Sequence, residues 1–159
     1  QATLDPVLGA TPARVRQADN QAAFVRLFTT AAAAEYVRAV AATGFGSRDE
    51  AVATRDAGAA MLDTLELAAA DRGDDAGAAT YGALRRAMVR DVGQRGASLA
   101  RVHALALAAT EPALVVANRL YGANDVERRA ADIVARNRLA HPAFLPGGDE
   151  LRVLAGEAA

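Results

Sequence analysis

Alanine dominates this sequence, and its abundance constrains the fold more than any other feature. Of the 159 residues, 43 are alanine, whereas aromatic residues make up 4% of the chain and tryptophan is absent. Alanine combines the highest helix propensity with a small side chain. The composition therefore predicts a mainly α-helical protein with thin, closely packed helices rather than a thick apolar core.

Charge, cysteine content and hydropathy exclude several classes of site. The formal net charge is −1, so the protein as a whole has no field that attracts nucleic acid or acidic lipid. Because cysteine is absent, disulfides, thiolate nucleophiles and cysteine-ligated metals are excluded. No apolar run reaches the roughly 18 residues that a membrane span requires. The longest candidate, residues 31–42, is interrupted by Glu35 and Arg38.

The first 19 residues show no sustained hydrophobic period. Pro6, Gly9 and Pro12 interrupt scattered apolar residues. Such a pattern is typical of an extended connector. We therefore expect residues 1–19 to be a linker from an upstream domain.

An Ala-rich helical region is predicted over residues 20–97, and it begins with a long helix. Asp19 or Asn20 is expected to cap this helix, and Gly44 to follow its end. Apolar residues at helical spacing predict one buried stripe, which consists of Phe24, Leu27, Phe28, Ala31, Ala34 and Val37.

Two further helices are predicted in the same region. Ser47 and Glu50 form a capping box, which opens a helix that runs to about residue 71. Another helix is expected over about residues 75–94. Short connections between long helices indicate antiparallel neighbours, so the region is predicted to be a three-helix bundle or an extended helical hairpin. The side chains expected to face inward are Val52, Met61, Leu62, Leu65, Tyr81, Leu84, Met88 and Val92.

The pattern changes in residues 98–155, which predict a small α+β module. Residues 99–109 fit a short strand about as well as a helix, and we take them as a strand; another strand is expected over residues 150–154. Between them we expect a helix from the Thr110 cap to Tyr121, and a second helix from Asn124 or Asp125 to about residue 138. The order is thus βααβ, followed by a tail at residues 156–159. The expected core is Leu114, Leu120, Ile133, Val134, Leu151 and Val153.

Several motifs of this module resemble the LysM family, in which a two-stranded sheet packs on two helices. Asn118–Gly122 resembles the end of that family's first helix, Ile133–Asn137 its second helix, and Leu145–Leu154 its closing turn and strand. Ala109–Glu111 replaces the family's Gly-Asp at the helix entry, a turn that lines the sugar-binding groove of the family. The motif residues, with a structural or interaction role, are Tyr121, Gly122, Asn137, His141, Pro142, Pro146 and Gly147.

The string from Leu120 to Leu154 also resembles the C-terminal end of the Mu-like phage DNA circularisation proteins. Residues 49–53 and 83–91 resemble the helical region of the same family, so the resemblance extends over residues 20–155. It implies a virion protein of the tail or baseplate that is made in the cytoplasm of a bacterial host. Other tail proteins and copies of the same chain are the implied partners.

No residue pattern indicates catalysis, a cofactor or a metal, so we do not expect an enzyme. A glycosidase needs two carboxylates that face each other across a groove. His103 is expected to lie partly exposed in the first strand, and His141 to bond the backbone at the exit of the second helix of the module. The carboxylate pairs each occupy a helix start or a turn, where they favour the helix dipole: Asp49/Glu50, Asp74/Asp75 and Asp149/Glu150.

A basic cluster at Arg85, Arg86 and Arg90 is the candidate for phosphate contact. Arg86 and Arg90 share one face of a helix. The cluster has no interleaved aromatic residues, so a solvated face or a salt-bridge partner is the alternative interpretation.

These observations favour a structural component of a phage tail or baseplate that docks onto neighbouring tail proteins. One alternative is binding of peptidoglycan N-acetylglucosamine chains by the LysM-like module. Another is DNA binding and circularisation after injection.

Overall fold

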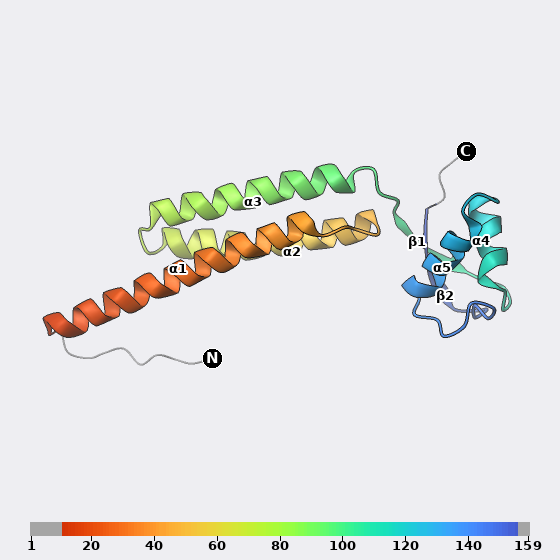
Figure 1. The fold of residues 1–159 in the computed structure, drawn as a ribbon, viewed down its shortest axis with the longest axis horizontal. Coiled ribbons are helices and arrows are strands. Elements are labelled where there is room, and N and C mark those ends of the chain that lie inside the picture. The colour runs from red at the N-terminus through yellow and green to blue at the C-terminus, as the bar shows by residue number, and fades with distance from the viewer. Residues whose placement is uncertain (1–10, 156–159) are drawn as a thin grey trace. The chain divides into compact units, whose positions relative to one another are not determined.

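In the computed structural model, residues 11–155 form five helices and one two-stranded sheet (Figure 1). The mainly helical fold class is confirmed, and so is the βααβ order of the last four elements. The structure describes residues 11–155, so the expected tail and the first ten residues of the expected linker lie outside the described residues. The elements are α1 (Pro12–Ala42), α2 (Arg48–Ala70), α3 (Asp75–Gly96), β1 (Val102–Ala106), α4 (Ala113–Tyr121), α5 (Val126–Arg136) and β2 (Glu150–Leu154).

The described chain divides into two compact units. We call residues 11–43 with 54–92 the helical unit, and residues 44–53 with 93–155 the C-terminal unit. This division differs from the expected boundary between residues 97 and 98, because the start of α2 belongs to the C-terminal unit.

Hydrogen bonds explain why the start of α2 groups with the C-terminal unit. The amide of Arg48 donates to the carbonyl of Ala100 over 2.9 Å. The amide of Val102 donates to Oδ2 of Asp49 over 2.8 Å. The predicted capping box is present, since Ser47 Oγ accepts from the Glu50 amide over 3.2 Å. The Glu50 carboxylate accepts from the Gly46 amide over 2.8 Å.

The first helix begins earlier than the sequence analysis expected. α1 starts at Pro12 rather than near Asp19 or Asn20, so residues 12–19 of the expected linker are helical. The Thr11 side chain accepts from the Arg14 amide over 3.4 Å, and proline occupies the first helical position. Proline is favoured there because its missing N–H needs no partner and its φ is already helical. Pro12 was therefore misinterpreted as a break.

The prediction of a buried stripe on α1 is also wrong, because the large residues of that stripe are exposed. Phe24, Leu27 and Phe28 are 61%, 63% and 69% exposed, whereas Ala33 and Val40 are the buried residues of the helix. Phe24 and Ala33 are nine residues apart, which at about 100° per residue places them on opposite sides of α1. α1 thus has apolar side chains on two faces, and the face with the smaller ones is buried.

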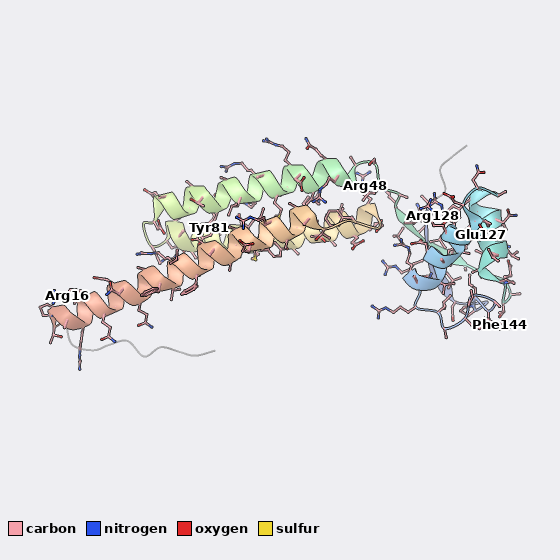
Figure 2. All side chains as sticks on the ribbon, viewed as in Figure 1. Arg16, Arg48, Tyr81, Glu127, Arg128 and Phe144 are labelled. Carbon is pink, nitrogen blue, oxygen red and sulfur yellow. The ribbon has the colours of Figure 1, made fainter. Side chains whose placement is uncertain are left out.

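Few large side chains form the core of the helical unit. Leu62 of α2 and Met88 of α3 are fully buried. Tyr81 lies among the three helices (Figure 2), and its hydroxyl is 3.0 Å from Oγ1 of Thr30 in α1. A Cβ added to Gly58 would lie 2.7 Å from Cε of Met88, so α2 and α3 approach closely at this point.

The C-terminal unit has a more conventional apolar core. β1 and β2 pair antiparallel, with Val102 opposite Leu154 and Ala106 opposite Glu150. Leu120 and Val134 of the expected core are partly buried, whereas Leu114 is 51% exposed and was assigned wrongly. Residues 113–117 are all apolar, so the sequence does not indicate which side of α4 is buried. The buried core is Leu107, Ala113, Val116, Ala117, Ala130, Ile133, Leu145, Leu151 and Val153.

Candidate functional site

A groove of about 500 Å³ lies in the helical unit between α1, the end of α2 and the start of α3. Val25 of α1 and Leu65 of α2 supply its large apolar surfaces, and the buried Tyr81 of α3 lies at its floor. Arg26 and Arg72 also line it. We call this feature the α1 groove. No local sequence pattern indicates this groove, because its lining comes from three separate segments.

A second apolar surface on α1 consists of Phe24, Leu27 and Phe28, which we call the Phe face. These residues do not line the α1 groove within the described chain. Every residue from 12 to 28 is exposed. The Phe face is therefore uncovered within the described chain.

Tyr121 and Asn137 connect the helices of the C-terminal unit to its last strand. The Tyr121 hydroxyl donates to the carbonyl of Leu154 over 2.9 Å. The Asn137 side chain donates to the carbonyl of Arg152 over 2.8 Å and accepts from the Arg152 amide over 2.7 Å. Burial raises the pKa of Tyr121. Gly122 ends α4 with a φ of 74°, a left-handed conformation that glycine adopts readily.

The other motif residues join the two loops at one end of this unit. The Pro142 carbonyl accepts from the Ala113 amide over 2.7 Å, which satisfies the start of α4. This start has Pro112 rather than Thr110 as its N-cap, which corrects the expected Thr110 cap. Gly147 lies against the backbone of Ala109, where an added Cβ would be 2.5 Å from the carbonyl carbon.

The loop that contains His141 exposes an aromatic pair. His141 Nδ1 accepts from the Ala143 amide over 3.1 Å, which confirms the expected backbone bond. The rings of His141 and Phe144 are 5.2 Å apart between centroids, and Phe144 is 67% exposed (Figure 2). Pro146 is half-buried between Leu145 and the Gly147 contact.

The three arginines proposed for phosphate contact do not act alike. Arg85 donates to Glu66 over 2.9 Å and lies 3.8 Å from Asp63, and the bond to Glu66 raises the pKa of its guanidinium. Arg86 and Arg90 are exposed and form no ion pair within residues 11–155. Only two of the three charges are therefore available to a phosphate.

The carboxylate pairs serve local structure rather than a shared site. Asp49 accepts from the Val102 amide, and this bond lowers the pKa of the carboxyl. Asp74 accepts from the Gly77 amide over 3.0 Å at the start of α3. His103 is exposed in β1, facing Val153 across the strand pair. Within residues 11–155, no group of three or more His, Asp or Glu side chains is placed to hold a metal ion.

Comparisons with protein-family models, curated proteins and solved structures returned no match. None of the described helices is long and apolar enough to cross a membrane.

Proposed function

We propose that this protein is a structural component of a phage tail or baseplate that docks onto neighbouring tail proteins and copies of itself. The proposal rests on the resemblance to the Mu-like DNA circularisation family and on the exposure of the Phe face. Its location would be the virion, after synthesis in the bacterial cytoplasm.

The size of the Phe face carries the docking part of the proposal. Its three side chains are at least 61% exposed. With about 150–250 Å² for a large apolar side chain, the face presents on the order of 350 Å². This value is in the range of the largest apolar patches that soluble monomers expose, and such patches are often interaction sites.

The exposure of the first half of α1 supports the same conclusion. Every residue from 12 to 28 is exposed, so this half gains little from packing within the described chain. In proteins, most of the stability of a helix comes from tertiary packing of its apolar face rather than from helix propensity. Contact with a neighbouring subunit would supply the missing apolar burial.

Sedimentation velocity of the full chain tests the docking face. We expect concentration-dependent self-association that is lost in the double variant Phe24→Ser/Phe28→Ser. Leu67→Ser is the matched control, because Leu67 is 58% exposed on α2 but lies outside the Phe face. Equal association of the wild type and the double variant would contradict the assignment of this face.

Localisation in particles tests the phage part of the proposal. We expect an antibody against the chain to label the tails of purified virions in electron micrographs. Consistent absence of the chain from purified tails would refute the tail assignment and would leave self-association as a separate result.

Peptidoglycan binding is a second candidate, favoured by the exposed aromatic pair His141 and Phe144. Aromatic side chains with a few polar groups commonly line small-ligand sites. Pull-down on purified peptidoglycan tests it, and Phe144→Ala should then abolish retention. DNA binding has less support, because Arg85 is paired with Glu66. A gel shift that persists at physiological salt would restore that alternative.

A further inference from the structure

The α1 groove combines an apolar floor with two cationic side chains that have no ion-pair partner in the part of the chain that the structure describes. Arg26 projects from α1 and Arg72 follows the end of α2, so the two cations belong to different walls. Neither guanidinium forms an ion pair within residues 11–155, and the described lining contains no carboxylate. The groove therefore has an uncompensated positive charge beside its apolar surface.

The dimensions of the groove suit an α-helix. Its lining on α1 extends from Ala18 to Thr29, which at 1.5 Å per residue is about 16 Å, or three turns. Ala22 and Ala68 present small side chains on the two sides. Small side chains at a contact let helix axes approach to the short end of the usual 8–10 Å range. Val25 is 56% exposed, so the groove is open to a helix along its length.

We propose that the α1 groove binds an acidic amphipathic helix of another protein. The apolar stripe of that helix would lie on Val25 and Leu65, above the buried Tyr81, and carboxylates on its flanks would pair with Arg26 and Arg72. Helix-in-groove binding of this kind is a recurrent mode of peptide recognition.

The exposed first half of α1 from a second copy of this chain is not a suitable occupant of the α1 groove. The first half of α1 carries Arg14, Arg16 and Arg26, and would bring like charges to the two groove arginines. The acidic residues Asp63 and Glu66 of α2 already face Arg85. The charge of the groove thus favours a different protein as its partner. The site is separate from the Phe face, and neither proposal requires the other.

Titration with synthetic peptides tests this inference on the full chain. The probe is a helical peptide with a leucine stripe flanked by glutamates, and the matched control carries lysine in place of every glutamate. We expect the glutamate peptide to bind at least about tenfold more tightly than the lysine peptide. Its affinity should fall as salt is raised, because exposed charge pairs are screened.

Variants locate the binding and can overturn it. Arg26→Glu/Arg72→Glu should reverse the preference between the two peptides, and Ala22→Trp should weaken the glutamate peptide by filling the groove. Phe24→Ser/Phe28→Ser should bind as the wild type does. Equal binding of both peptides, no binding of either, or loss of binding only in the Phe-face variant would each overturn the proposal. Circular dichroism of each variant checks that the helices are retained.

Discussion

The two units of this protein are stabilised in different ways. In the C-terminal unit, a core of branched side chains is combined with side-chain bonds to the backbone, such as those of Asn137 to Arg152. In the helical unit, the largest apolar residues of α1 are exposed, and the buried apolar residues are Ala33, Val40, Leu62, Ala69, Tyr81, Met88 and Val92. The comparison shows that similar alanine-rich sequence can produce a unit that buries its large apolar side chains, and one whose first helix keeps them exposed within the described chain.

The largest expected effect is the loss of a core side chain from the C-terminal unit. Ile133 is fully buried, and Ile133→Ala should lower the free energy of unfolding of this unit by about 2–5 kcal/mol. Leu114→Ala is the control, because Leu114 is half exposed on the same pair of helices and should cost less than about 0.5 kcal/mol. Denaturant unfolding of the full chain measures both. Similar losses for the two variants would show that the core assignment is wrong.

A steric change should have the next largest effect. Gly147→Ala places a Cβ 2.5 Å from the backbone of Ala109, so the two loops must separate. The expected cost is about 1–3 kcal/mol, as for an overpacked core. Gly93→Ala is the matched control, because nothing lies within 4 Å of its added Cβ and it is inside a helix. That control should stabilise α3 by about 0.5–1 kcal/mol. Equal behaviour of the two variants would contradict the loop packing.

The melting temperature of the helical unit should depend on protein concentration, whereas that of the C-terminal unit should not. Association of copies stabilises the folded state by mass action, so melting of α1 should shift to higher temperature as concentration rises. Circular dichroism follows the helices, and hydrogen exchange of α5 and β2 reports the other unit. A sharp, concentration-independent melt of a monomer would count against assembly through α1.

The smallest expected effect is a pH dependence at the start of α2. The bond from the Val102 amide lowers the pKa of Asp49 below its ordinary 3.8, so the folded state favours the carboxylate. Its contribution is present above the unfolded pKa and is lost as pH falls through the lower, folded pKa. NMR titration of the Val102 amide should follow this loss, and Asp49→Asn should remove the step. An unchanged titration in Asp49→Asn would assign the step to another group.

Local signals in the sequence predicted many element ends. Ser47 and Glu50 correctly marked the start of α2, and the turn before residue 150 correctly placed β2. Pro12 was misinterpreted, because proline both interrupts helices and favours their first turn. The motif residues Tyr121 and Asn137 were singled out from the sequence, but only their bonds to Leu154 and Arg152 reveal what they connect.

The sequence by itself determined that this chain is mainly helical and ends in a βααβ module, because propensity, caps and turn residues act over a few neighbouring positions. Only the tertiary structure decided which face of α1 is buried and which side chains line the α1 groove. Helix α1 is apolar on two sides, so Ala33 and Phe24 were equally suited to burial by local pattern. The face of α1 that is buried is the one that allows α2 and α3 to approach closely. This depends on the side chains of all three helices together.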